Sequence, residues 1–127
     1  MRKVGFITTN RVFAQSCAAA IEARPDLGFI PLPLLNPAQA LLDAEIMQID
    51  LALLDISTEN IRDIELLSAF CKELRLKLPG CRIMLLAFQN DKQACDLVRQ
   101  AMKGNDADDF VYNDTSLEYL FAKLASL

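Results

Sequence analysis

The chain has 127 residues, of which 53% are apolar and 24% are charged, and its formal net charge is −4. A chain of this length and apolar content is expected to bury one core as a single domain, residues 1–127, and not to remain disordered. The balance of 17 acidic against 13 basic residues excludes the basic footprint of a nucleic-acid or anionic-membrane binder, and the lack of histidine excludes imidazole chemistry.

Short apolar segments predict strands that are covered on both faces. In chain order they are residues 4–7, 29–35, 51–56, 83–88 and 110–112. The segments between them carry apolar residues at helical spacing, most clearly in residues 61–78 and 94–102. Each of these intervening segments therefore predicts a helix with one apolar stripe.

Residues typical of helix ends agree with this division of the chain. Asn36, directly before a proline, predicts the start of a helix, and Pro79-Gly80 predicts the end of another. Thr115 with Glu118 three residues later predicts a capping box for the last helix.

The repeated order of strand, helix and strand requires a parallel sheet with right-handed crossovers. The predicted fold is a three-layer, doubly wound α/β sandwich of five β/α units. Pro31 and Pro33 make the second strand a poor central strand and favour an edge position. The flavodoxin-like strand order 2-1-3-4-5 places the second strand at an edge, so we expect that order.

The cysteines and the termini indicate a cytoplasmic protein. Cys17, Cys71, Cys81 and Cys95 stand singly, so neither a zinc site nor a redox dithiol has its spacing, and we expect four reduced core thiols. No apolar stretch approaches the ~18 residues of a membrane span, and no signal peptide is evident. The chain is expected to be the amino-terminal domain of a longer protein or a small adaptor.

In folds of this class, ligands bind at the carboxyl ends of the strands, near the point where the strand order reverses. The first strand is followed by Thr8, Thr9 and Asn10, and no glycine-rich loop is present there. Dinucleotide and P-loop sites need such glycines, so we expect no cofactor of those kinds.

Three motifs carry a resemblance to a known family. The third strand reads D-L-A-L-L-D-I over residues 50–56, residues 106–112 read D-A-D-D-F-V-Y, and residues 116–120 read S-L-E-Y-L. In this order and spacing, the chain resembles the receiver domains of response regulators, CheY-like proteins of two-component signal transduction and phosphorelay. The resemblance implies that Asp55 stands at the position of the aspartate that accepts a phosphoryl group.

The chain departs from the family at the other pocket positions. Receivers hold magnesium with two acidic residues after the first strand, where this chain has Thr8 and Thr9. The hydroxyl that ends the fourth strand is replaced by Leu86 or Ala87, depending on a one-residue alignment choice, and the lysine that ends the fifth strand is replaced by Asn113. Losing a divalent cation and a lysine beside a phosphoaspartate forfeits on the order of 10 kcal/mol before solvent compensates.

The departures predict a pseudo-receiver, a non-enzymatic regulatory module without bound metal that acts through protein contacts, with Asp55 vestigial. The resemblance places a partner or homodimer face on the fourth helix, the fifth strand and the fifth helix. The candidate residues of that face are Lys92, Arg99, Tyr112, Tyr119 and Lys123. Two alternatives remain open. One is a weak phosphoacceptor that uses Asp55, and the other is a small-ligand sensor in a neutral pocket at the strand ends.

Overall fold

Five parallel strands form one sheet in the order β2-β1-β3-β4-β5, which confirms the predicted topology. A computed structural model describes residues 1–56, 61 and 63–127. Its strands are β1 (Arg2–Ile7), β2 (Phe29–Leu34), β3 (Leu51–Asp55), β4 (Arg82–Ala87) and β5 (Asp109–Tyr112). Its α-helices are α1 (Arg11–Glu22), α2 (Ala40–Met47), α3 (Ile64–Lys77), α4 (Lys92–Lys103) and α5 (Leu117–Ala125).

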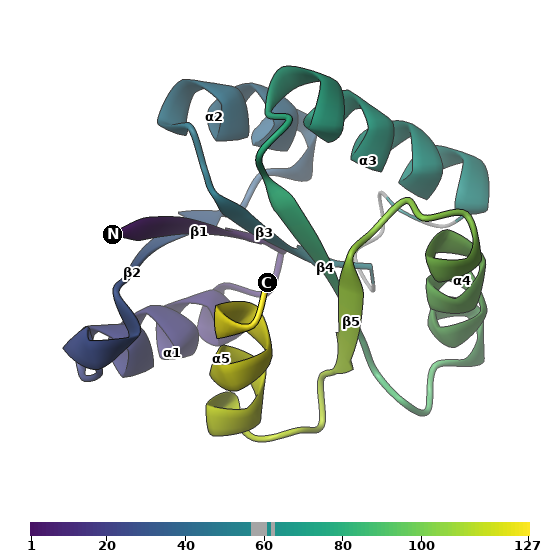
Figure 1. Ribbon diagram of the computed structural model, residues 1–127. Helices are drawn as coiled ribbons and strands as arrows, with labels where there is room; N and C mark the ends of the chain where they lie inside the picture. The colour runs from purple at the N-terminus through teal and green to yellow at the C-terminus, as the bar shows by residue number, and fades with distance from the viewer. Residues whose placement is uncertain (57–60, 62) are drawn as a thin grey trace.

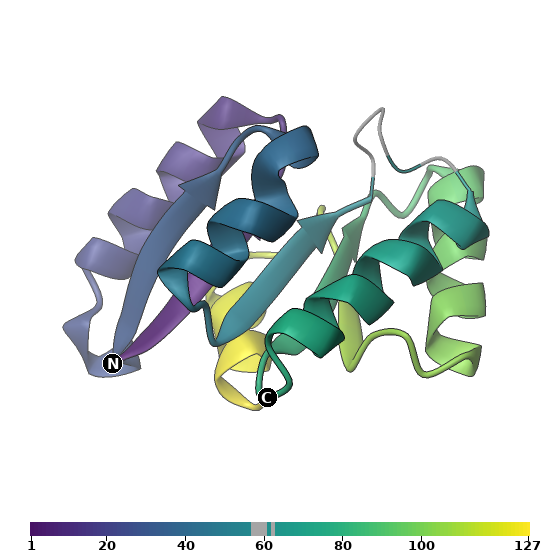
Figure 2. The ribbon, with the colours of Figure 1, turned by 90° about the horizontal axis from the view of Figure 1, so that it is seen from above.

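The helices form two layers, one on each face of the sheet (Figure 1). Helices α1 and α5 pack against one face, and α2, α3 and α4 pack against the other, as the view from above also shows (Figure 2). All residues of the central strand β3 are buried, since both faces are covered. No helix in the part of the chain that the structure describes is long and apolar enough to cross a membrane.

The edge position of β2 follows from its prolines. The N–H of Arg2 donates to the carbonyl of Gly28, and the N–H of Thr8 donates to the carbonyl of Leu34, at 2.9 and 3.3 Å. Backbone groups of alternate residues in a parallel strand face the same neighbour, so the even-numbered residues of β2 face β1. Pro31 and Pro33 therefore face outward, where no neighbour needs the N–H that proline lacks.

The helix caps confirm one prediction and correct another. The side chain of Asn36 accepts the N–H of Ala38 at 3.1 Å and begins a 3-10 turn, Pro37–Gln39, that leads into α2. The capping box predicted at Thr115 is wrong, because Ser116 is the cap and accepts the N–H of Tyr119 at 3.1 Å. Thr115 belongs instead to the preceding turn, where its N–H donates to a carbonyl of β5.

Gly5 lies at a close approach between β1 and the core beneath α2. A Cβ atom on Gly5 would lie 2.9 Å from Cδ1 of Ile49 and 3.3 Å from Cδ1 of Leu34. We therefore expect Gly5→Ala to lower the free energy of unfolding by about 1–3 kcal/mol, the usual cost of overpacking a core. Ile49→Val removes the crowded Cδ1 atom, so the double variant should lose less stability than the two single losses predict. Urea unfolding measures both effects, and simple additivity would contradict this account.

Candidate functional site

A buried hydrogen bond joins the carboxyl ends of the two central strands β1 and β3. Asp55 is the last residue of β3 and is 4% exposed, while Thr8 directly follows β1 and is 1% exposed. The two residues meet because β1 and β3 pair in register, with Ile7 opposite Leu54. The Thr8 hydroxyl donates to Oδ2 of Asp55 at 2.7 Å. A carboxylate is thus retained inside the protein by a neutral donor.

The same hydroxyl also fixes the start of α1. Oγ1 of Thr8 accepts the N–H of Asn10 at 3.0 Å, and the Asn10 side chain accepts the N–H of Phe13 at 3.0 Å as the cap of α1. Thr8 therefore uses its hydroxyl both as a donor to Asp55 and as an acceptor from the backbone. Thr9, the second neutral residue of the predicted pocket, is exposed.

The predicted pocket residues at the ends of β4 and β5 are Leu86, Ala87 and Asn113, which carry neither a hydroxyl nor a charge. Leu86 lies opposite Asp55 in the β3–β4 register, and both Leu86 and Ala87 are 1% exposed. Leu86 packs in the core under α1 and α5, whereas Ala87 packs in the core under α2, α3 and α4. Asn113 is half-buried, and its N–H donates to the carbonyl of Ala87 at 2.7 Å.

These residues do not fit magnesium, the metal of the family that the sequence resembles. Magnesium requires near-octahedral oxygen ligands and usually one or two carboxylates. Among the described residues, no group of three or more His, Cys, Asp or Glu side chains could hold a metal ion. Asp55 already accepts a hydrogen bond from Thr8, whose oxygen is used in turn by Asn10. Asp55 and Thr8 are arranged as a hydrogen-bonded junction between two strand ends and not as a set of metal ligands.

Three of the four cysteines are buried, whereas Cys95 lies just beyond β4, where its Sγ is 3.5 Å from the carbonyls of Phe88 and Gln89. Burial raises the pKa of the Cys17 and Cys71 thiols to about 12 and that of Cys81 to about 11, so these side chains stay protonated at neutral pH. Cys95 departs from the prediction of four core thiols, because it is only half-buried in the first turn of α4.

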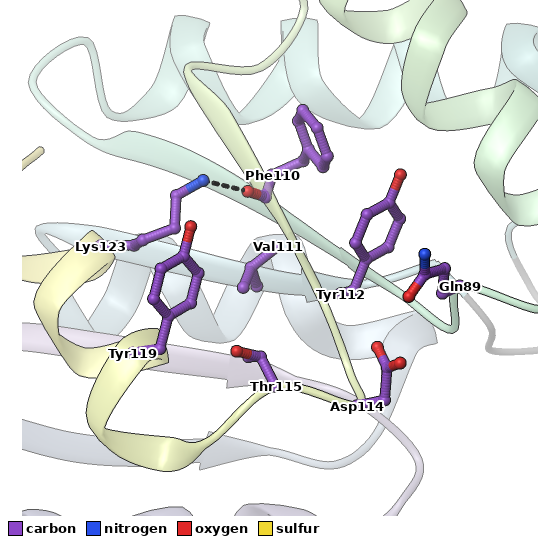
Figure 3. A pocket seen from close by; sticks show the side chains of 8 residues that line it. All are labelled: Gln89, Phe110, Val111, Tyr112, Asp114, Thr115, Tyr119 and Lys123. Carbon is purple, nitrogen blue, oxygen red and sulfur yellow. Dashed lines mark hydrogen bonds between the residues drawn. The ribbon is translucent and has the colours of Figure 1, made fainter.

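A cleft of about 370 Å³ lies beside the other edge of the sheet, between β5 and α5 (Figure 3). It lies on the face that the sequence predicted for partner binding. Two tyrosines and a lysine give it both apolar and polar character. The residues that line it are Gln89, Phe110, Val111, Tyr112, Asp114, Thr115, Tyr119 and Lys123.

Lys123 is the most constrained polar side chain of this cleft. Its ammonium donates to the carbonyl of Phe110 at 2.8 Å and lies 3.2 Å from a carboxylate oxygen of Asp109 (Figure 3 shows the first bond). It also lies 5.3 Å from the centre of the Phe110 ring and 5.8 Å from that of Tyr119. The sequence reasoning missed the roles of Asp109 and Phe110. The two-residue period of β5 was a usable signal, since it places Phe110 and Tyr112 on one face, where their rings meet edge to face at 5.7 Å.

The predicted partner-face residues fall into two groups. Tyr112, Tyr119 and Lys123 line the cleft. Lys92 and Arg99 lie exposed on α4, which covers the opposite face of the sheet from α5, and Arg99 forms an ion pair with Asp96 on its own helix. The cleft extends around the edge strand β5, since Phe110 of its lining packs against the core on the α4 side whereas Tyr119 and Lys123 come from α5.

Solved structures similar to this chain include response-regulator receiver domains from bacteria. A DNA-binding response regulator of the LuxR family from Staphylococcus aureus is similar with a TM-score of 0.76 and 19% identity, over 99% of this chain and 98% of that one. The chemotaxis protein CheY4 of Vibrio cholerae is similar with a TM-score of 0.74 and 17% identity, over 99% and 98%. No family model and no curated protein matches the sequence.

A third similar structure was solved in a phosphorylated form. It is a response regulator from Burkholderia pseudomallei with a phosphorylated aspartic acid, a calcium ion and citrate. Its TM-score is 0.70 at 23% identity, and the match covers 99% of this chain and 69% of that one. At these identities the likeness establishes a shared receiver fold, and the chemistry of this chain must be argued from its own residues.

The junction between Thr8 and Asp55 predicts a specific loss of stability. Thr8→Val keeps the shape but removes the hydroxyl, so Asp55 loses a donor and the Asn10 N–H loses its acceptor. We expect Thr8→Val to lower the free energy of unfolding by about 1–3 kcal/mol. Thr8→Ser keeps the hydroxyl and should retain most of the stability of the natural chain. Thr9→Val, on an exposed neighbour, should change it by less than about 0.5 kcal/mol. Urea denaturation tests these values, and equal effects of the two valine substitutions would contradict the junction.

Proposed function

We propose that this domain is a pseudo-receiver, a regulatory module that acts through constitutive protein contacts and not through a magnesium-dependent phosphorylation cycle. One observation carries the proposal. Asp55 is 4% exposed and accepts a 2.7 Å hydrogen bond from the neutral Thr8, at the strand end where a phosphorylated receiver would need acidic metal ligands. The junction is satisfied without a metal ion, and no acidic neighbour follows β1.

Electrostatics supports this proposal. A phosphoryl group on Asp55 would bring about two negative charges to the end of β3. Thr8 and Thr9, Leu86 or Ala87, and Asn113 are neutral at the positions that match the family's acidic pair, hydroxyl and lysine. The missing opposite charges are the lysine and the magnesium ion that the acidic pair would hold, and each unit of positive charge at about 4 Å is worth roughly 4 kcal/mol at an effective dielectric near 20. Transfer and retention of a phosphoryl group are therefore disfavoured.

The surface around β5 supports the protein-contact part of the proposal. Tyr119 is 52% exposed at the cleft, and Arg99 is exposed on α4. Tyrosine and arginine are over-represented among residues that dominate binding energy at protein interfaces. We infer that a protein partner, or a second copy of the chain, docks on this face through side chains.

Magnesium binding is the first direct test. Among the described residues no group of three or more acidic, His or Cys side chains could hold a metal ion, so we expect calorimetric titration to show no magnesium affinity tighter than about 1 mM. The variant with Thr8→Asp and Thr9→Asp restores two carboxylates and should bind magnesium more tightly than the natural chain. Submillimolar affinity of the natural chain that disappears in Asp55→Asn would contradict the proposal.

The second candidate is a weak phosphoacceptor, favoured by the position of Asp55 at the carboxyl end of β3. Incubation with a small phosphodonor and magnesium distinguishes the two functions. The pseudo-receiver predicts that intact mass spectrometry finds almost no modified protein. Stoichiometric modification of Asp55 together with a tenfold change in self-association would establish the phosphoacceptor in its place.

Docking on this face predicts that substitutions of its exposed residues weaken association more than a substitution of Asp55 does. Arg99→Ala and Tyr119→Ala should weaken partner binding or homodimerisation, by more than about 1 kcal/mol each if they are central to the interface. Asp55→Asn makes no contact on that face and should change the association free energy by less than about 1 kcal/mol. Sedimentation equilibrium of the purified variants measures self-association. A larger effect of Asp55→Asn than of Tyr119→Ala would contradict side-chain docking on this face.

A further inference from the structure

The outer edge of β5 offers two residues for strand pairing. The N–H of Asn113 donates to the carbonyl of Ala87 at 2.7 Å, so the odd-numbered residues of this segment face β4. The backbone groups of Phe110 and Tyr112 then face outward. An open edge of this kind is a template for another strand unless something covers it.

Side chains and a turn occupy three of these four outward groups. The N–H of Phe110 donates to Oδ1 of Asp109 at 2.8 Å, and its carbonyl accepts the ammonium of Lys123 at 2.8 Å. The carbonyl of Tyr112 accepts the N–H of Thr115 at 3.3 Å. The bond from Lys123 differs from the other two because it comes from a separate element, α5. Lys123 thus ties the edge strand to a helix.

The two edges of the sheet are therefore closed in different ways. On β2 the outward residues Pro31 and Pro33 lack the N–H group, and this block is covalent and permanent. On β5 the block depends on a long side chain, that of Lys123, which is 23% exposed and is held by Asp109 at 3.2 Å. A flexible side chain can leave its position, whereas a proline ring cannot.

We propose that Lys123 is a latch on the edge of β5, and that its removal lets the β5 strands of two copies of this chain pair antiparallel across a two-fold axis. The outward-facing residues of β5 determine the register of this pairing. Centred on Val111, it places Phe110 of each copy opposite Tyr112 of the other. The N–H of Tyr112 then donates to the Phe110 carbonyl that Lys123 vacates, and the return bond forms when the N–H of Phe110 leaves Oδ1 of Asp109, which has lost its ion pair with Lys123. The carbonyl of Tyr112 keeps a second lone pair for this bond.

The side chains of β5 suit a second copy as the occupant of this edge. Aromatic residues placed opposite each other across two strands stabilise the pair, and Phe110 and Tyr112 are both aromatic. In the same register, Asp109 lies opposite Asn113, so no like charges meet within residues 109–113, and the like-charged pair Asp108 and Asp114 lies outside β5. The sequence Phe110-Val111-Tyr112 is also of high strand propensity.

The first test is the variant Lys123→Met, which keeps the aliphatic stem and removes the ammonium. We expect its dimer dissociation constant, from sedimentation equilibrium at protein concentrations up to about 1 mM, to be at least tenfold lower than that of the natural chain. Lys103→Met is the matched control, since it removes the same charge from the exposed last turn of α4 and should leave association unchanged. Lys123→Arg retains a donor for the Phe110 carbonyl and should behave as the natural chain.

The second test asks whether the gained dimer uses the backbone of β5. Adding Tyr112→Pro to Lys123→Met removes the outward N–H, as the prolines of β2 do, and should abolish the gained dimer. Adding Tyr112→Ala instead removes the ring but keeps the N–H, and should leave most of the dimer intact. In Lys123→Met, hydrogen exchange at the Tyr112 amide should slow as protein concentration rises.

Two results would overturn the latch. One is a Lys123→Met protein that is folded by circular dichroism and associates no more tightly than the natural chain or Lys103→Met. The other is a gained dimer that Tyr112→Pro leaves unchanged. If Lys123→Met fails to fold, Asp109→Ala frees the Phe110 N–H and one partner of Lys123, and it must then show the gain. The proposed function predicts weaker association for Tyr119→Ala, so either inference can fail without the other.

Discussion

The hydrogen bond from Thr8 to Asp55 is the contact on which the carboxyl end of the sheet depends. It connects the ends of the two central strands, and through Asn10 the same hydroxyl positions the first turn of α1. A buried carboxylate without hydrogen-bond donors would cost several kcal/mol, so the Thr8 hydroxyl stabilises Asp55 at this position. This junction explains how the Asp55 side chain is accommodated at 4% exposure at the end of β3, with a neutral threonine beside it.

The sequence predicted the elements that depend on local pattern, and it failed where a tertiary contact decides. Continuous apolar runs identified β3 and β4, and Pro31 and Pro33 identified the edge strand, because burial and the missing N–H group are visible in single residues. The cap of α5 was placed one residue early, since Thr115 and Ser116 are chemically equivalent and only the preceding turn selects between them. The bond between Lys123 and the Phe110 carbonyl joins two elements through a backbone atom, and residue types carry no signal of it.

The residue types of the candidate site could be predicted from the sequence, but their arrangement in space could not. The neutral residues Thr8 and Asn113 could be read from the sequence once the strand ends were aligned. Their geometry could not, because Thr8 is buried and Thr9 is exposed although they are neighbours of the same type. The chain direction after β1 determines which of the two hydroxyls reaches Asp55. A composition argument treats the two threonines alike, whereas the structure gives one of them the hydrogen bond to Asp55 and leaves the other at the surface.

The replacement of acidic residues beside Asp55 also changes what the domain can respond to. Two carboxylates about 4 Å apart repel by roughly 4 kcal/mol at an effective dielectric near 20, and a receiver pocket relieves that repulsion when it binds a cation. With Thr8 in place of an acidic residue, the repulsion is absent and a cation gains little by binding. Lys123 forms an ion pair with Asp109 and a hydrogen bond to the Phe110 carbonyl, and a partner can replace both contacts with its own. A change of state in this domain is therefore expected at the β5 edge.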